Sequence, residues 1–227
     1  DLGRFCLSLV KHYGVRMLEL FLVLIKIVIA VVATLGLIIK SGILKKEPRN
    51  DLFLFFTNLT ALLCALFYFY DAFLVGFGLG ENSVALNVKA AIVVYSFVVF
   101  AIYNFVLVPM HRGSNAVQGI YSFSDVLIHC AMPVLILADW ALFTVKGAIA
   151  FASPFLWLVF PGLYIVVIVL RAKCKFGPKI AYLDSYYPYF FIDAEKIGMK
   201  KTVLNPIVLA FIFVILGLVL WIVDKVL

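Results

Sequence analysis

Hydroxyl, imidazole and carboxamide side chains recur near one end of the long apolar segments of this chain. Thr57 lies six residues after Asp51, and His129 lies seven residues after Ser122, where Asp51 and Ser122 mark expected helix starts. At 1.5 Å per helical residue, both side chains are expected roughly 9 to 10 Å along their helices. Asn104, four residues before the end of another segment, is expected at about the same depth. A hydroxyl, an imidazole and a carboxamide at one level are the minimum set for acyl transfer to a side-chain oxygen.

Asn58, Thr60 and Asn205 are further candidates for this polar layer, and Thr60 is close enough to Thr57 to be the nucleophile in its place. The structural alternative is strong for these residues, because threonine in membrane helices often bonds the carbonyl four residues earlier and asparagine often joins helices. His129 is different, since an ionisable group about two turns inside a membrane helix is costly and indicates a functional site by default.

Asp125 precedes His129 by four residues and could orient its imidazole. However, Asp125 also follows Ser122 by three residues, the spacing of a capping box at a helix start. We favour the capping role, because it explains Asp125 without any function.

The sequence contains none of the motifs of competing chemistries. H-E-x-x-H, G-x-S-x-G and the Walker loop are absent, and the four cysteines show no C-x-x-C spacing. We therefore expect no metal, no cofactor and no disulfide scaffold. The net charge of +7 comes without a Lys/Arg stripe interleaved with aromatic residues, so a nucleic-acid partner is not expected either.

The composition determines the kind of elements that must position these residues. Of the 227 residues, 66% are hydrophobic and 14% are charged, and the mean hydropathy is +1.15, far outside the range of soluble domains. The apolar residues form unbroken runs, which favour helices over a β-barrel. The sequence, which starts at Asp1 and is expected to be trimmed or processed, shows no internal repeat. It predicts an all-α protein, a single six-helix transmembrane bundle over residues 1–227 with spans at about 18–39, 52–75, 88–108, 124–145, 154–170 and 203–223.

The distribution of charge predicts the orientation of these spans. With six spans, the first, third and fifth connections share one side, which carries twelve lysines and arginines against six, Lys89 among them, on the other. The positive-inside rule makes the basic connections cytoplasmic in a multi-pass protein. Asp71 and Asp139 lie toward the opposite side, where we expect them to pair with Lys26 or with helix ends.

An aromatic segment, residues 186–193, lies in the fifth connection on the same side as the polar layer. One interpretation is an aromatic belt at the membrane surface. The other is a re-entrant lid that shields the site and holds an acyl chain, in which case Tyr187, Tyr189 and Asp193 are candidates for contact with the substrate.

Three short stretches resemble a known family. They are FFTNLT at 55–60, LIHCAMP at 127–133 followed by DW at 139–140, and YPYFFID at 187–193. They look like the bacterial predicted six-transmembrane family, which is related to the androgen-induced and androgen-dependent transmembrane hydrolases of animals. Those enzymes cleave fatty acid esters of hydroxy fatty acids with a threonine and a histidine. The chain departs from the animal members around the histidine and in the aromatic loop, so the resemblance implies the chemistry more than the substrate.

The resemblance implies that Thr57 is the nucleophile and that His129, which precedes a proline by four positions, is its base. Asn58, Asn104 or a backbone N–H would meet the oxyanion. The implied activity is hydrolysis of a lipid ester that enters from the bilayer, either a fatty acid ester of a hydroxy fatty acid or a related lipid ester. The alternative is a non-enzymatic lipid-binding or small-molecule carrier in which Thr57 and His129 bind without cleaving a bond.

Overall fold

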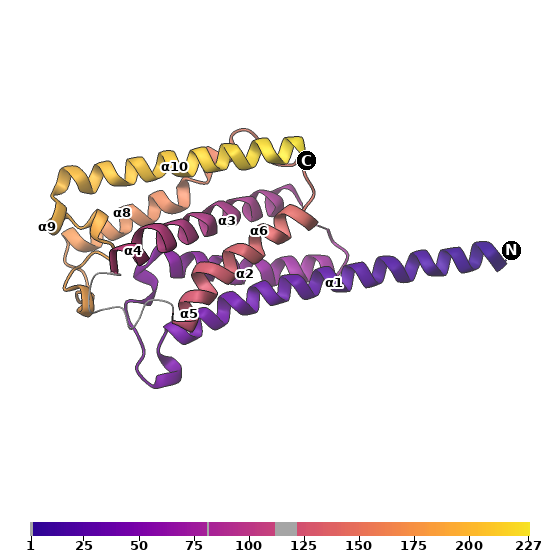
Figure 1. Ribbon diagram of the computed structural model, residues 1–227, viewed down its shortest axis with the longest axis horizontal. Coiled ribbons are helices and arrows are strands. Elements are labelled where there is room, and N and C mark those ends of the chain that lie inside the picture. The colour runs from indigo at the N-terminus through magenta and orange to yellow at the C-terminus, as the bar shows by residue number, and fades with distance from the viewer. Residues whose placement is uncertain (1, 81, 112–121) are drawn as a thin grey trace.

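The computed structural model describes residues 2–80, 82–111 and 122–227, and this part of the chain is all-α (Figure 1). It contains six helices long and apolar enough to cross a membrane, so the predicted six-helix fold of a multi-pass membrane protein is confirmed. The spans are Arg16–Lys40, Phe56–Gly76, Ser83–Leu107, Phe123–Phe143, Ser153–Lys173 and Met199–Val226. Residues 112–121, most of the third predicted connection, lie outside the described residues.

The spans are built from the following elements. The first three are α1 (Leu2–Lys40), α2 (Phe56–Gly76), and α3 (Ser83–Ile102) continued by the π-helical turn η3 (Tyr103–Leu107) and by α4 (Val108–His111). The fourth joins α5 (Phe123–Val126), the π-helical turn η5 (Leu127–Ala131) and α6 (Met132–Phe143). The last two are α7 (Ser153–Leu156) with α8 (Val159–Lys173), and α10 (Met199–Val226), which follows the short α9 (Ala194–Ile197).

The predicted start of the second span, residue 52, is wrong. Leu52–Leu54 forms a separate 3₁₀ turn, η2, and α2 begins only at Phe56. Asp51 does not cap a helix with its side chain, because both carboxylate oxygens accept hydrogen bonds from Arg49, at 3.0 and 2.8 Å. By contrast, the third span begins earlier than predicted, at Ser83, since the side chain of Asn82 accepts a hydrogen bond from the Ala85 N–H.

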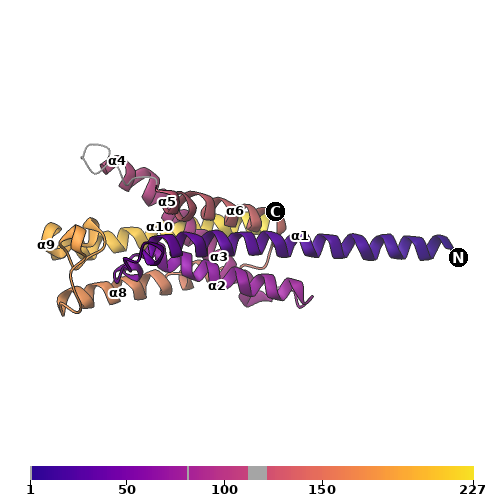
Figure 2. The same cartoon turned by 90° about the horizontal axis from the view of Figure 1, so that it is seen from below.

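At the centre of the bundle, α1 packs against α2 and the fourth span, and α3 packs against α2 and α6 (Figures 1 and 2). Small residues such as Ala30, Ala33 and Ala61 are fully buried there, which lets the helix backbones approach closely. Gly36 has the same effect, because a Cβ at this position would lie 2.5 Å from Cγ1 of Ile128. The α1 helix therefore sets the position of the η5 turn.

Large apolar side chains cover the outside of the bundle. On α10, Val208, Phe211 and Ile215 are half or more exposed, and α8 and α1 carry similar residues. Contiguous apolar surface of this extent is expected where lipid is the solvent.

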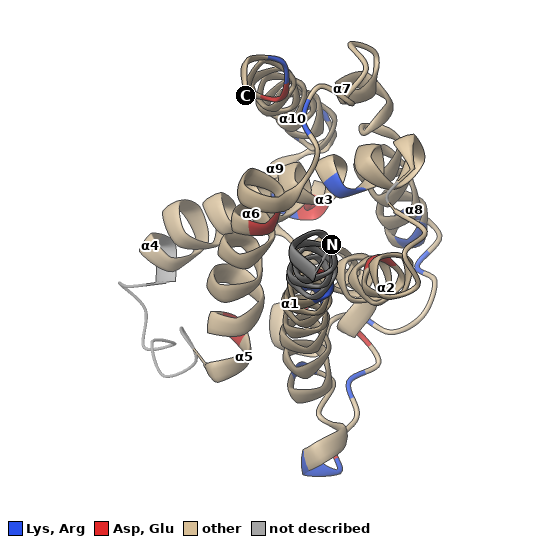
Figure 3. Cartoon of the chain, turned by 90° about the vertical axis from the view of Figure 1, so that its right-hand side faces the viewer, with Lys and Arg blue, Asp and Glu red and all other residues tan. Residues whose placement is uncertain are grey.

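A cluster of four buried charged residues joins four helices near the end opposite the basic connections. Lys26 lies 2.7 Å and Lys89 lies 2.8 Å from Oδ2 of Asp71, while Asp139 lies 3.6 Å from Lys26 and 3.3 Å from Lys89. The pairing of both aspartates with Lys26 agrees with the sequence prediction. The position of Lys89 differs from the prediction. The sequence places it among the surface charges of this side, whereas the structure buries it fully. Figure 3 views the bundle from this end, with α1, α2, α3 and α6 grouped at its centre.

Candidate active site

Thr57 lies at the very start of α2, as its second residue. The prediction of a position 9 Å along the helix is therefore wrong, because η2 separates Asp51 from the helix. The first N–H groups of a helix have no acceptor within it and form its positive end. The N–H groups of Asn58 and Leu59 donate to the Phe55 carbonyl, whereas those of Phe56 and Thr57 have no acceptor within the helix and lie close to the threonine hydroxyl.

His129 is placed by a π-helical turn, η5, which precedes Pro133. Proline has no N–H, so it cannot bond the carbonyl four residues earlier, which is that of His129. Asn104 supplies a replacement: its Nδ2 donates to the Phe100 carbonyl at 2.8 Å and reaches the His129 carbonyl at 3.5 Å. π-Helical turns are rare in proteins, and those that occur are often found at functional sites.

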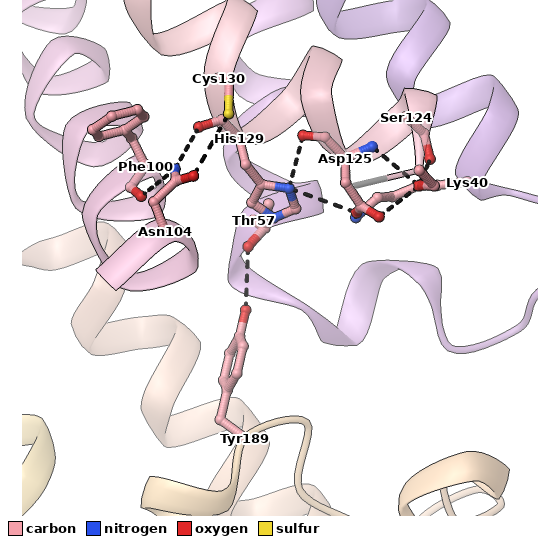
Figure 4. Close-up of polar contacts among 10 residues, drawn as sticks. Lys40, Thr57, Phe100, Asn104, Ser124, Asp125, His129, Cys130 and Tyr189 are labelled. Carbon is pink, nitrogen blue, oxygen red and sulfur yellow. Dashed lines mark hydrogen bonds and ion pairs between the residues drawn. The ribbon is translucent and has the colours of Figure 1, made fainter. Parts of the chain in front are cut away.

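The imidazole of His129 is buried and held from two sides (Figure 4). Its Nδ1 lies 3.1 Å from the backbone carbonyl of Asp125, and its ring stacks on Tyr103 with centroids 3.7 Å apart. Because a carbonyl can only accept, this hydrogen bond places the proton on Nδ1 and leaves the lone pair on Nε2. The neutral ring therefore presents a base at Nε2.

Asp125 takes part in the cap through its backbone and lies beside His129 through its side chain, the two positions that the sequence offered. The Ser122 side chain accepts a hydrogen bond from the Asp125 N–H, which caps the helix as predicted. The carboxylate also pairs with Lys40 at 2.7 Å and lies 3.6 Å from Nδ1 of His129. It adds a second acceptor beside the same ring nitrogen.

Tyr189, from the aromatic segment, is the residue that faces the Thr57 hydroxyl, at an O···O distance of 3.5 Å (Figure 4). Burial raises the pKa of Tyr189, so its phenol is protonated at neutral pH and can donate a hydrogen bond. The backbone at Phe56 and Thr57 is close enough to the Tyr189 hydroxyl to lower this pKa slightly. A phenol and helix-terminal N–H groups therefore converge beside the threonine.

Two cavities meet at Thr57. The polar cavity, of about 370 Å³, carries the charged and polar side chains of Lys40, Arg49, Asp125 and His129, and the rest of its wall is largely apolar. The apolar cavity, of about 360 Å³, lies between α3, α8 and α10 and is lined almost entirely by apolar side chains. Thr57, Tyr103, Leu107 and Tyr189 line both.

The other candidates of the polar layer occupy different positions. Thr60 is fully buried, lines neither cavity, and its hydroxyl has no hydrogen-bond partner among the described residues. Asn58 lines the polar cavity, and its Nδ2 donates to the Leu52 carbonyl at 2.7 Å, while its Oδ1 is buried without a hydrogen-bond partner among the described residues. Asn104 lies behind His129 and lines neither cavity, and Asn205 donates to the Phe191 carbonyl at 2.6 Å, which fastens the aromatic segment to α10.

Within the aromatic segment, only part of the predicted set faces the cavities. Tyr189 does, whereas Tyr187 is buried against α8 and lines neither cavity. Asp193 accepts hydrogen bonds from the Ser185 hydroxyl at 2.7 Å and from the Glu195 N–H at 3.1 Å. Asp193 therefore organises the loop that carries Tyr189.

Sequence reasoning missed Tyr103 and Lys40 as parts of this site. Tyr103 directly precedes Asn104 and could have been inferred from the expected depth of that residue. Lys40 is one of the twelve lysines and arginines counted on the basic side. Its contact with Asp125 joins α1 to α5, which are far apart in the sequence, so no local pattern indicates it.

No hydrogen bond joins Thr57 to His129 directly, although both line the polar cavity, and Figure 4 shows Thr57 between His129 and Tyr189. Catalytic hydrogen bonds are often long or incomplete before substrate binds. The arrangement offers a hydroxyl, a neutral imidazole and hydrogen-bond donors around one cavity.

Within the described residues, no group of three or more His, Cys, Asp or Glu side chains is arranged to hold a metal ion. No family model, curated protein or solved structure matches the chain.

Proposed function

We propose that the protein hydrolyses lipid esters inside the membrane, with Thr57 as nucleophile and His129 as general base. The observation that carries this proposal is the position of Thr57, which shares the polar cavity with His129 and also borders the apolar cavity. A lipid ester needs both environments, because its carbonyl is polar and its chain is apolar. The likeness of three stretches to the six-transmembrane hydrolase family agrees with this proposal, and we propose that the chain is a member of it.

In the first half of the proposed reaction, Nε2 of His129 takes the proton of the Thr57 hydroxyl as its oxygen attacks the ester carbonyl carbon. The electron pair of the C=O bond moves to the carbonyl oxygen. When it returns, the bond to the alcohol oxygen breaks, and the alcohol leaves with the proton that His129 gives back. The acyl group is then bonded to Thr57.

In the second half, water attacks the acyl carbon and passes a proton to His129. The bond to Thr57 breaks, the threonine oxygen recovers that proton, and a free fatty acid leaves. In both halves the oxyanion forms near the start of α2, where the phenol of Tyr189 and the first backbone N–H groups can donate to it. Asn58 contributes less to this proposal, since its Nδ2 already donates to the Leu52 carbonyl.

The test of this proposal is covalent labelling with a fluorophosphonate probe, together with release of fatty acid from lipid esters that include fatty acid esters of hydroxy fatty acids. We expect the wild type to be labelled and active, Thr57→Ala to lose both, and Thr57→Ser to retain both. Thr60→Ala is the matched control and should behave as wild type. Wild-type protein that binds the esters without consuming them, or Thr57→Ala that remains active, would establish the carrier alternative or another nucleophile.

We also propose that the end carrying the basic connections and the polar cavity faces the cytoplasm, as the excess of lysine and arginine there favours. Cys174 is exposed at this end. A membrane-impermeant maleimide should label it only in opened membranes, with Cys174→Ser as the control, and labelling in intact cells would reverse the assignment.

A further inference from the structure

The proposed nucleophile borders two cavities of nearly equal size. The polar one measures about 370 Å³ and the apolar one about 360 Å³, both within the range of small-molecule sites. Thr57 and Tyr189 belong to the walls of both. A substrate whose reacting carbon lies at Thr57 can therefore extend in two directions.

The two directions differ in chemistry. Lys40, Arg49 and Asp125 place charges around the polar cavity, where an alkyl chain would cover them from water at a cost in free energy. The apolar cavity presents mainly hydrocarbon side chains and two prolines, Pro161 and Pro206. No charged residue lines the apolar cavity, so a long alkyl chain covers no charge there.

The apolar cavity exists because two facing helices carry small residues at its centre. At α8 the wall includes Leu158, which stands at the N-cap of the helix, with Gly162 and Ile165, and on α10 Ala210 lies between Pro206 and Phe213 in the same way. These spacings of three and four residues define one face of each helix. A Cβ at Gly162 would meet no atom within 4 Å, so the space beside it is open.

The same cavity reaches the outer surface of the bundle. Ile207 lines it and is 47% exposed, and Gly162 lines it and is also exposed. Because this surface faces lipid in a membrane-spanning bundle, an acyl chain can pass from the bilayer into the cavity without crossing water.

We infer that the ester is divided at Thr57, with its acyl chain in the apolar cavity and its alcohol part in the polar cavity, and that Gly162 and Ala210 set the longest acyl chain accepted. This inference rests on the proposed function. It assigns the longer alkyl chain of a preferred substrate to the acid, and a shorter or more polar group to the alcohol.

Filling the apolar cavity tests the inference. Ala210→Phe and Gly162→Leu each place bulk in it from a different helix, and Val208→Phe and Leu163→Phe are matched controls on the exposed faces of the same helices. The substrates are ethyl butyrate, ethyl palmitate and hexadecyl acetate, of which the last two are isomers with the long chain on opposite sides of the ester.

We expect wild type and both controls to cleave ethyl palmitate faster than hexadecyl acetate. The two cavity-filling variants should lose at least about tenfold in kcat/KM for ethyl palmitate, since each excluded methylene costs about fourfold. Cleavage of ethyl butyrate should stay within about twofold of wild type, which also reports that the variants are folded.

Two results would overturn the inference. One is an unchanged ratio of ethyl palmitate to ethyl butyrate cleavage in both variants, whether or not both rates fall. The other is a selective loss on hexadecyl acetate. Thr57-dependent cleavage with either of these results leaves the proposed function intact. Wild-type protein that cleaves none of the three esters overturns the proposed function and this inference together.

Discussion

At the scale of single residues, the site depends on where protons and lone pairs lie. The carbonyl of Asp125 assigns the proton of His129 to Nδ1, and the stacked ring of Tyr103 restricts rotation of the imidazole. A base with a defined tautomer and orientation needs little reorganisation when Thr57 loses its proton. The Thr57 hydroxyl, in contrast, must turn from Tyr189 toward the imidazole once substrate is bound.

Tyr189→Phe removes the hydroxyl beside Thr57 and keeps the ring that packs against Phe55 and Phe191. We expect kcat to fall by about 10- to 100-fold with little change in KM, because a donor to the oxyanion acts mainly in the transition state. The measurement is steady-state hydrolysis of a lipid ester. Tyr187→Phe is the control on the same segment and should behave as wild type. A larger effect on KM than on kcat would instead assign Tyr189 to substrate binding.

At the scale of elements, both π-helical turns precede a proline: η5 precedes Pro133, and η3 precedes Pro109. Each proline leaves one carbonyl without its helical donor, and the polar side chain of Asn104 on the first turn bonds the freed carbonyl of His129 on the second. This hydrogen bond thus links η3 to η5 and fixes the position of the imidazole along the bundle axis.

Gly36 on α1 should control the position of the η5 turn. A Cβ there would lie 2.5 Å from Cγ1 of Ile128, the neighbour of His129, so Gly36→Ala must displace that side chain. We expect a loss of about 1–3 kcal/mol in the free energy of unfolding, as for other overpacked sites, together with a lower kcat. Thermal unfolding in detergent and the ester assay measure the two effects.

The matched control for this substitution is Gly76→Ala, whose Cβ would meet only Val23, at an ordinary distance of 3.7 Å. Ile128→Ala removes the atoms that clash, so the double variant with Gly36→Ala should be less destabilised than the sum of the single variants. Additive losses would show that Gly36 and Ile128 are not coupled.

At the scale of the whole molecule, the two ends of the bundle differ in how their charges are used. At the basic end, charged residues line a cavity. At the opposite end, Lys26, Lys89, Asp71 and Asp139 are almost fully buried and compensate one another across four helices. Charges removed from solvent are tolerated when they are paired, and breaking a pair leaves one uncompensated.

Asp71→Asn tests the role of this cluster. Because Asp71 lies within 2.8 Å of both lysines, its neutralisation should lower the free energy of unfolding by about 3–5 kcal/mol. The double variant Asp71→Leu with Lys89→Met removes one charge of each sign and should cost less than the sum of its two single variants. Asp184→Asn, at an exposed ion pair with Lys179, is the control and should leave thermal unfolding unchanged. A small effect of Asp71→Asn would exclude a stabilising role for the cluster.

The sequence alone determined the class of fold, because unbroken apolar runs long enough to cross a bilayer have one stable form in lipid, the helix. It also predicted the cap at Ser122, and it indicated Lys26 as one of two alternative partners for Asp71 and Asp139, since a buried carboxylate requires a cation or a helix end. It selected His129 by the cost of an ionisable group in hydrocarbon, and Thr57 by its expected depth and by the resemblance. These inferences depend on properties of single residues or of neighbours along the chain.

Only the tertiary structure decided which of these groups share a cavity. The start of α2 at Phe56, the burial of Lys89, the stacking of Tyr103 on His129 and the separation of Thr60 from both cavities follow from packing between helices that are distant in sequence. Helical periodicity gives the depth of a side chain but not which neighbour its face meets. The rotation and register of each helix are set by small contacts such as Gly36 against Ile128, which no pattern within one helix contains.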